Sequence, residues 1–341
     1  MEYPKFKVCC RCFTFNQAKY ITDAMNGFTM QQTSFPFVCT IVDDASTDGE
    51  QEVIRKYVEE NFDFSEGSVA FLKETDYAHI TYAQHKTNMN CYIAVLYLKE
   101  NHYSQRKPKM GYLSEWRDMC EYEALCEGDD YWTHPEKLQR QVDYLENHSE
   151  CGLVYTKVKR LIEKTNEYDG FWGKYCTYED LLMNPSSIPT LSACYRNDIA
   201  RKYRESIKDD PKWPLGDVPM WLYFMRFSSI HFIDEVMGVY RILPESASNS
   251  GDFYKTIKFF NGAYKCRAFY AKRYWGQDLE KRIHTYSLRR VSNDSIGYGT
   301  KCPVPVLRDL IKYRILDLNT WCRCLFAQST FLIKLYKLCN F

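Results

Sequence analysis

The chain has 341 residues, of which 45% are hydrophobic and 16% aromatic, a composition that supports a large buried core and excludes a mostly disordered protein. Its formal net charge is only +1, yet the segment 253–341 holds 17 basic residues against 5 acidic ones. The rest of the chain is therefore acidic overall. We predict a body at 1–252 that uses cations and a basic, helical extension at 253–341.

The cysteines and the N-terminus indicate where the protein works. The 15 cysteines follow no disulfide or zinc-site spacing, so we expect reduced thiols that pack as small apolar side chains. The opening MEYPKFKV carries no apolar signal segment, and no stretch of about 18 apolar residues could span a bilayer. We therefore expect a cytoplasmic protein. An acidic body without a known nucleic-acid module argues against nucleic-acid binding.

Strand-like and helix-like segments alternate along the body. Apolar runs predict strands at 6–15, 35–42, 68–74, 122–127, 151–162, 188–196 and 230–242. Helical spacing of apolar residues predicts helices at 16–31, 47–62, 88–101, 112–121, 133–148, 177–184 and 215–228. This alternation predicts an α/β fold with right-handed crossovers and a mixed, mainly parallel sheet flanked by helices. After 253 the pattern is helical, with a break at 297–305.

Two clusters of carboxylates directly follow predicted strands. Asp43 and Asp44 come after Ile41-Val42 of the second strand, and Glu127, Asp129 and Asp130 come after Ala124-Leu125 of the fourth. Ligands of open α/β sheets bind beyond the carboxyl ends of strands, where carboxylates suit Mg²⁺ or Mn²⁺ together with phosphate oxygens. Asp at such positions also caps the next helix, and for either cluster alone both interpretations stay open. The two clusters together favour a site for a nucleoside diphosphate and a cation.

The order of motifs points to one family. The sequence contains neither GxxxxGK[ST] nor HExxH, which excludes a P-loop and a zincin site. Over about residues 5–250 it resembles the inverting, family-2 type glycosyltransferases of the GT-A fold, in their EGDDYW subgroup. The segments that carry the resemblance are FTFNQAKYI (13–21), VDDASTDG (42–49), EGDDYWTHPEKLQRQVDYLE (127–146), GLVYT (152–156), IPTLSACYR (188–196), PLGDVPMWLY (214–223) and VMGVYRI (236–242).

The resemblance implies a donor site for a nucleotide sugar, with UDP as the expected nucleotide. Phe15 would stack on the nucleobase, and a place in the core is the alternative. Asp44 would hydrogen-bond the base, with Asp43 toward the ribose. Asp129 would bind the Mn²⁺ or Mg²⁺ ion that bridges the diphosphate, and Asp130 is a close contender for that ligand.

Three further residues take roles by their place in the motif order. Glu127 replaces the first Asp of the family's DxD motif and is assigned to the donor site with its contact left open. Asp217 would be the general base that removes a proton from the acceptor hydroxyl, and a helix cap is the alternative. Arg241 would contact the diphosphate, and a surface position or an ion pair with an acid is the alternative.

The end of the chain, 320–341, mixes large apolar residues with Lys and Arg. Such a helix suits an anionic membrane surface, here the inner face of the cell membrane, but it also suits packing on the body or on a second copy. Both interpretations stay open, and the oligomeric state is not predicted.

The sequence therefore predicts a metal-dependent inverting glycosyltransferase of the hexosyltransferase type. Its donor would be a nucleotide sugar, and the resemblance alone implies that its acceptor is a glycan or lipid-linked glycan of bacterial surface polysaccharide synthesis. One alternative is a nucleotidyltransferase on a similar sheet, although no Gly-rich phosphate loop follows the first strand. A second alternative is a non-catalytic glycan-binding relative, against which the joint presence of Asp44, Asp129, Asp130 and Asp217 argues.

Overall fold

The computed structural model describes residues 3–183, 187–244 and 252–338, and the chain folds into two compact units. The first unit consists of Met1–Tyr175, Ile188–Ile207 and Ser228–Ile242, and the second of Cys176–Ser187, Lys208–Phe227 and Leu243–Phe341. The basic extension predicted at 253–341 thus belongs to the second unit, together with segments from earlier in the chain. That this extension is a domain of its own stays a prediction.

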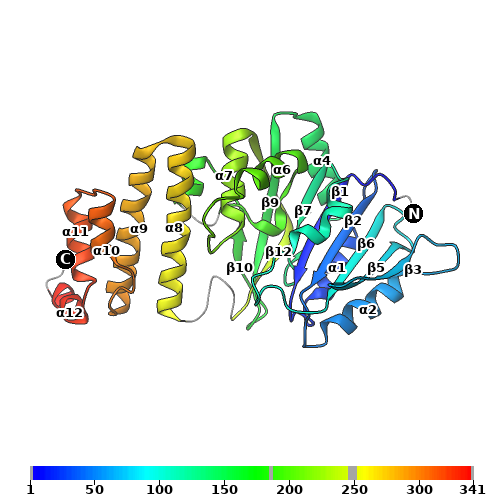
Figure 1. Cartoon of the computed structure of the whole chain (residues 1–341), viewed down its shortest axis with the longest axis horizontal. Helices are drawn as coiled ribbons and strands as arrows, with labels where there is room; N and C mark the ends of the chain where they lie inside the picture. Colours follow the sequence, from blue (N-terminus) through cyan, green and yellow to red (C-terminus); the bar gives the residue numbers. More distant parts are fainter. Residues whose placement is uncertain (1–2, 184–186, 245–251, 339–341) are drawn as a thin grey trace. The chain divides into compact units, whose positions relative to one another are not determined.

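The first unit is built on one mixed sheet (Figure 1). Its strands are β1 (Val8–Thr14), β2 (Phe37–Asp43), β3 (Phe62–Asp63), β4 (Phe71–Glu74), β5 (Ala78–His85), β6 (Cys91–Leu98), β7 (Tyr122–Leu125), β8 (Tyr131–Trp132), β9 (Cys151–Ile162), β10 (Glu167–Trp172), β11 (Cys194–Arg196) and β12 (Ser229–Ile242). The order across the sheet is β3-β5-β6-β2-β1-β7-β11-β9-β12-β8, with β4 beside β5 and β10 beside β9. Strands β6, β2, β1 and β7 run parallel, so their carboxyl ends share one edge.

Helices cover both faces of this parallel core. The helices of the first unit are α1 (Ile21–Thr29), α2 (Glu50–Asn61), α3 (Ser114–Arg117), α4 (Lys137–Asn147) and α6 (Asn197–Ser206), with 3₁₀ turns at Met110–Leu113 and Thr190–Ser192. Apolar residues of α1, α2 and α4 pack on one face, in a core cluster with Cys10 and Cys12 of β1. Leu113 and Trp116 pack on the other face with Cys9. Alternate side chains of β1 therefore serve two cores, as strand geometry requires.

One predicted element is wrong. The helix expected at 88–101 is strand β6, which pairs with β2 in the centre of the sheet. Every residue of Cys91–Leu98 is buried, so the apolar run shows neither a helical nor an alternating period and does not by itself distinguish the two structures. The third parallel strand is therefore β6, whereas the predicted strand at 68–74 is the edge strand β4, antiparallel to β5.

The second unit is helical. Its elements are α5 (Tyr178–Met183), α7 (Asp217–Phe227), α8 (Phe253–Trp275), α9 (Gln277–Tyr298), α10 (Val306–Lys312), α11 (Leu318–Phe326) and α12 (Thr330–Leu338). Thr177 caps α5: its hydroxyl accepts a hydrogen bond of 3.2 Å from the Asp180 amide. The long helices α8 and α9 pack side by side, and α10 and α11 pack on α9 (Figure 1).

The predicted fold class is confirmed: a mixed, mainly parallel sheet is flanked by helices, and helices follow at the C-terminal end. Every described cysteine is free, and all but Cys322 are buried, as expected of thiols used for packing. Across 3–183, 187–244 and 252–338, none of the helices is long and apolar enough to cross a membrane.

Candidate functional site

The two acidic clusters flank the same strand. Strand β1 lies between β2 and β7, with Thr14 opposite Asp43 and Arg11 opposite Leu125. The residues that follow β2 and β7 therefore emerge at one edge, on either side of the β1–α1 loop. Both clusters thus lie at carboxyl ends of strands on one edge of the sheet, with β1 between them.

Hydrogen bonds tie the β1–α1 loop to the β2–α2 loop. The Asn16 amide donates to Ser46 Oγ at 2.9 Å, the Thr47 amide donates to Asn16 Oδ1 at 2.8 Å, and the Ala18 amide donates to Asp48 Oδ2 at 3.0 Å. These bonds hold both loops in one arrangement.

Backbone strain gathers in the same two loops. Asn16 and Ala45 have φ angles of 54° and 58°, in the left-handed region that side chains with a Cβ rarely adopt. Such conformations persist where the surroundings enforce them, and they cluster at functional sites. The two loops are therefore held in a conformation that their own residues do not prefer.

A carboxylate outside the two acidic clusters also hydrogen-bonds to both loops. Glu50 is completely buried at the start of α2. It accepts hydrogen bonds from the Gln17 amide at 2.9 Å, from Ser46 Oγ at 2.8 Å and from the Thr14 hydroxyl. Burial raises the pKa of Glu50, and these hydrogen bonds oppose the rise. In the sequence Glu50 is an ordinary first-turn acid of a helix, so no local signal identifies it.

Asp43 faces helix α2 and is fully buried. Its Oδ2 accepts hydrogen bonds from Gln51 Nε2 at 2.5 Å and from the Ser46 amide at 3.3 Å, whereas its Oδ1 has no hydrogen-bond partner among the described residues. Burial raises the pKa of Asp43, against the hydrogen bonds, which lower it. In this structure Asp43 supports the β2–α2 loop.

Asp44 faces the segment that follows β6. Its two carboxylate oxygens accept hydrogen bonds from the amides of His102 at 2.8 Å and Tyr103 at 3.0 Å, and Lys109 Nζ lies 2.8 Å from Oδ2. The charge of Asp44 is therefore balanced by a segment nearly sixty residues away in sequence, and the sequence gives no sign of Lys109.

Phe15, in the β1–α1 loop, is 44% exposed, which rules out its alternative as a core residue.

The second cluster forms a tight turn, in which the Asp130 amide donates to the Glu127 carbonyl at 3.2 Å. Only glycine fits at position 128, because a Cβ there would lie 2.3 Å from Thr14 Oγ1 and 2.5 Å from Gln17 Oε1. The turn thus packs directly on the end of β1, and Gly128 is the residue that permits this approach.

Arg241 of β12 holds this turn. Its amide donates to Asp130 Oδ1 at 2.8 Å, and its Nη1 donates to the Asp129 carbonyl at 2.7 Å. The guanidinium also pairs with Asp23 of α1 and lies over the rings of Tyr20 and Tyr131, with its Cζ 4.9 and 4.8 Å from the ring centroids. The acid-paired alternative for Arg241 is thus observed, and its contact with a diphosphate stays a prediction.

The two Asp carboxylates differ in exposure. Asp130 is 5% exposed, and Asp129 is half-buried. Burial raises the pKa of Asp130 well above its ordinary value, and the charges of Asp129 and Glu127 raise it further. Burial also raises the pKa of Asp129, which the charge of Arg241 partly offsets. Neighbouring carboxylates in a poorly solvated turn gain stability from a cation.

The turn fits a divalent ion that brings further ligands with it. Among the described residues, no group of three or more His, Cys, Asp or Glu side chains could hold a metal by itself. Asp129 and Asp130 offer hard oxygen donors, which suit Mg²⁺ and Mn²⁺, and these ions complete their coordination with water and phosphate oxygens.

Asp217 belongs to the second unit, where it is the first residue of α7. Its Oδ1 accepts a hydrogen bond of 2.8 Å from the Val218 amide. Trp221, on the same helix, is 1% exposed and packs in the core. Asp217 thus lies at the start of a helix, and its role as general base stays a prediction.

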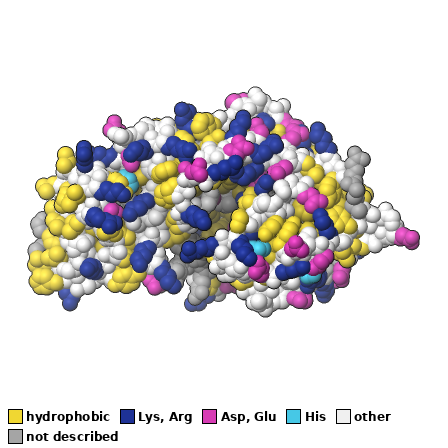
Figure 2. Space-filling view, viewed as in Figure 1, with side chains coloured by type: hydrophobic (Ala, Val, Ile, Leu, Met, Phe, Trp, Pro, Cys, Tyr) yellow, Lys and Arg dark blue, Asp and Glu magenta, His cyan; other side chains and the backbone are white. Residues whose placement is uncertain are grey.

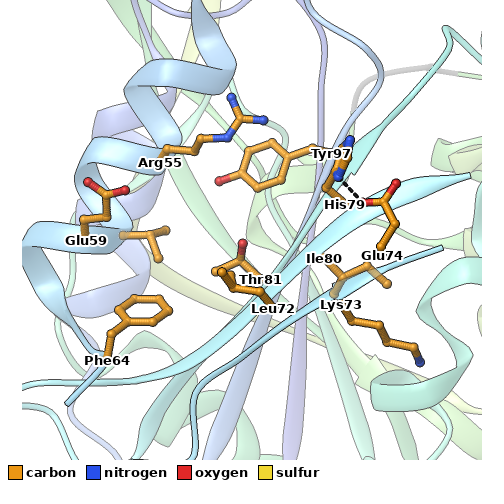
Figure 3. Close-up of a pocket in the computed structure, with 11 residues that line it drawn as sticks. Arg55, Glu59, Phe64, Leu72, Lys73, Glu74, His79, Ile80, Thr81 and Tyr97 are labelled. Carbon is orange, nitrogen blue, oxygen red and sulfur yellow. Dashed lines mark ion pairs between the residues drawn. The ribbon is translucent and has the colours of Figure 1, made fainter. Parts of the chain in front are cut away.

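The first unit also has a cavity of about 620 Å³ between α2 and strands β4, β5 and β6 (Figure 3). Arg55 and Tyr97 lie together at one side of it, with the guanidinium Cζ 4.5 Å from the ring centroid. Arg55 Nη2 also donates to Gln51 Oε1 at 3.2 Å, and Gln51 in turn binds Asp43. The cavity therefore adjoins the support of the β2 cluster and does not include the carboxylates of either cluster.

Comparison with known sequences gives distant relatives of unknown activity. No protein-family model matches the chain. Uncharacterized proteins of Mycobacterium bovis and Mycobacterium tuberculosis are 29% identical to it over 240 residues, which cover 67% of this chain and 56% of theirs. The match thus spans about half the length of these curated relatives.

Comparison with solved structures identifies the fold. Staphylococcus aureus TarS 1–349 in complex with UDP-GlcNAc is similar with a TM-score of 0.52 and 14% identity, over 94% of this chain and 79% of that chain. The same protein in complex with UDP is similar with a TM-score of 0.52 and 16% identity, over 98% of this chain and 92% of that chain. The mannosyltransferase PcManGT of Pyrobaculum calidifontis, in complex with GDP-Man and Mn²⁺, is similar with a TM-score of 0.50 and 14% identity, over 99% of this chain and 88% of that chain. The expected GT-A fold is confirmed.

Proposed function

We propose that this protein is an inverting glycosyltransferase that takes its sugar from a nucleotide diphosphate sugar, with UDP as the nucleotide. The observation that carries the proposal is the acidic turn at 127–130 beside β1, where three carboxylates are crowded and burial raises the pKa of Asp129 and Asp130. Asp44 lies on the other side of β1. Solved proteins of the same fold hold UDP-GlcNAc, or GDP-Man with Mn²⁺, and this supports the same ligand class here.

In the proposed donor complex the nucleobase lies over the β1–α1 loop. Phe15 stacks on the base, since its ring is exposed and its loop is fixed by cross-loop hydrogen bonds. The Asp44 carboxylate accepts a hydrogen bond from an N–H of the base. This N–H replaces Lys109 Nζ, which lies on Asp44 Oδ2 in the structure. Asp43 holds the β2–α2 loop beneath the ribose through Ser46.

The diphosphate and its cation lie at the turn. Asp129 is the direct ligand, because its carboxylate is the more exposed, and Asp130 is the second candidate, held in place by the Arg241 amide. Glu127 adds a third negative charge at the edge of the same turn. A bound Mn²⁺ or Mg²⁺ neutralises charge on the leaving diphosphate.

Asp217 is the proposed general base. It takes the proton of the acceptor hydroxyl while that oxygen forms a bond to the anomeric carbon. The bond from this carbon to the diphosphate oxygen breaks, and the nucleoside diphosphate leaves with the electron pair. A single displacement of this kind inverts the anomeric configuration. The acceptor is a glycan or lipid-linked glycan, and the setting is bacterial surface polysaccharide synthesis in the cytoplasm.

A donor screen tests the whole proposal. The protein is incubated with Mn²⁺ and a panel of nucleotide sugars, and release of the nucleoside diphosphate is measured together with thermal stability. We expect one UDP-sugar to be hydrolysed slowly and UDP with Mn²⁺ to raise the melting temperature. In a parallel incubation with added pyrophosphate, formation of a nucleoside triphosphate and a sugar 1-phosphate would indicate the nucleotidyltransferase instead. Failure of all nucleoside diphosphates to stabilise the protein would exclude the donor site.

Asp217→Asn separates the base from the donor site. The variant keeps the stabilisation by UDP and Mn²⁺, and its transfer rate falls by about 10²–10⁴-fold, as expected when a general base is lost. Asp209→Asn, an exposed acid that precedes α7, is the matched control. Transfer by Asp217→Asn at the normal rate would exclude this role.

A further inference from the structure

The outermost helices of the second unit expose apolar side chains in an unusual pattern. On α12, Phe331, Leu335 and Leu338 are 72%, 44% and 80% exposed, and their spacing places them on one side of the helix. Ile333, on the other side, is buried against the unit. A surface helix normally turns its polar side outward, and α12 exposes large apolar side chains as well as its lysines.

A second group of exposed apolar residues lies at the turn from α10 to α11. Ile311, Leu316 and Leu318 are 68%, 85% and 76% exposed. We call these three residues and the three of α12 together the apolar-basic surface; helix α11, which begins at Leu318, lies between the two groups in the chain. Figure 2 shows hydrophobic side chains mixed with Lys and Arg at the end of the second unit that carries α10 to α12.

Basic residues accompany both apolar groups. Lys312 and Arg314 stand beside the turn, and Lys334 and Lys337 beside the residues of α12. Lys312, Arg314 and Lys334 have no acidic partner among the described residues, and Lys337 donates to the Gly297 carbonyl at 3.1 Å. The apolar-basic surface is therefore strongly positive.

The acids of this region do not offset that charge. Asp309 is 2% exposed and lies 3.1 Å from Lys265 Nζ, and Asp317 lies 2.8 Å from Arg289 Nη2. Within 301–338 these are the acidic residues, and both are paired inside the second unit. Two copies that met through this surface would bring like charges together, which disfavours a dimer there.

We infer that the apolar-basic surface binds an anionic lipid bilayer. The apolar side chains enter the boundary between head groups and acyl chains, and the four basic side chains contact lipid phosphates, the arrangement known for interfacial helices. This inference does not depend on the proposed transfer reaction, because lipid binding is measured without donor or acceptor.

Vesicle binding tests the inference directly. The full chain is sedimented with vesicles of phosphatidylcholine alone and with vesicles that also contain phosphatidylglycerol. We expect binding to the anionic vesicles, weakened by salt, and little binding to the neutral ones. No binding to the phosphatidylglycerol vesicles, or equal binding to both kinds, would overturn the inference.

Substitution of the apolar group separates membrane contact from general stickiness. The variant Phe331→Gln/Leu335→Gln/Leu338→Gln is expected to bind more than tenfold more weakly. The matched control Leu72→Gln/Met89→Gln/Phe171→Gln changes three exposed apolar residues of the first unit and should bind as the native protein does. Equal losses in both variants would contradict the inference. Light scattering gives a second test. A dimer of the native protein that the first variant dissociates would also contradict the inference, because the surface would then join two copies.

A charge variant tests the lipid phosphates. Loss of one basic residue near an anionic membrane weakens binding about fivefold, so Arg314→Gln/Lys334→Gln should weaken it about 25-fold. Arg201→Gln/Lys202→Gln removes an Arg and a Lys from α6 and is the matched control, with no change expected. If the two double variants bind alike, net charge alone is responsible and the assigned surface is wrong.

Discussion

The acidic clusters after β2 and β7 look alike in sequence, but the structure compensates their charges differently. After β2, Asp43 and Asp44 are fully buried and their carboxylates accept hydrogen bonds from Gln51, Lys109 and backbone amides. After β7, the pKa values of both Asp residues are raised by burial, and that of Asp130 also by its acidic neighbours. In the first cluster the protein itself supplies Asp44 with two backbone amides and Lys109, whereas for the second cluster our proposed partner is a cation.

The strongest test of this comparison is Asp129→Asn, which removes the proposed direct cation ligand. We expect the transfer rate to fall by about 10³-fold, because loss of a metal or its charge costs several kcal/mol of transition-state stabilisation. Turnover of the nucleotide sugar at saturating Mn²⁺ measures the effect. Asp143→Asn, an exposed acid on α4, serves as control, and equal rates for the two variants would remove Asp129 from the cation site.

Within the first cluster, Asp44→Asn should affect both binding and stability. We expect UDP affinity to fall by about tenfold or more, and the free energy of unfolding to fall by about 2 kcal/mol, because hydrogen bonds to a charged group are lost. Calorimetry with UDP and urea denaturation measure the two quantities. A loss of stability with unchanged affinity would show that Asp44 only anchors the segment at 102–109.

Asp43→Asn is the matched variant in the same cluster. It removes a buried charge whose Oδ1 has no hydrogen-bond partner among the described residues, so the free energy of unfolding should stay constant or rise. UDP affinity should change less than in Asp44→Asn. The opposite ranking in the calorimetric titrations would move the base contact from Asp44 to Asp43.

The second cluster should also respond to pH. Because the folded-state pKa of Asp130 lies above its unfolded-state value, the folded protein binds more protons between the two values, and the free energy of unfolding falls as pH rises through that window. Each pKa unit of difference between the folded and unfolded states changes the free energy of unfolding by about 1.4 kcal/mol. Mn²⁺ with UDP requires ionised carboxylates, so its stabilising effect should disappear as pH falls through the same window. Melting temperatures measured across pH, with and without Mn²⁺ and UDP, check this. Asp130→Asn should weaken the pH dependence of the melting temperature.

The smallest expected effect is that of Phe15→Ala. The ring is exposed, so the free energy of unfolding should not change. Loss of stacking should weaken UDP binding by about fivefold, equivalent to about 1 kcal/mol. Phe64→Ala, at a ring 40% exposed beside the cavity, is the control, and equal affinities for the two variants would show that Phe15 does not touch the base.

Sequence periodicity identified most of the elements that carry the site. Strands β1, β2 and β7 and helices α1, α2 and α4 lie where apolar spacing predicts them, and the acids follow the predicted strands. Strand β6 was predicted as a helix, because a segment buried on all sides carries no period that separates helix from strand. The segment after β6 holds Lys109, so this error also concealed the partner of Asp44.

The sequence by itself determined the alternation of strands and helices, the two clusters of acids behind strand ends, and the basic character of the C-terminal helices. These are local properties, set by spacing and residue type. Only the tertiary structure decided that Glu50 fastens two loops, that Gly128 lets the acidic turn reach β1, and that Arg241 holds this turn. Each of these contacts joins residues far apart in the chain, so its energy depends on burial and geometry that no local pattern encodes.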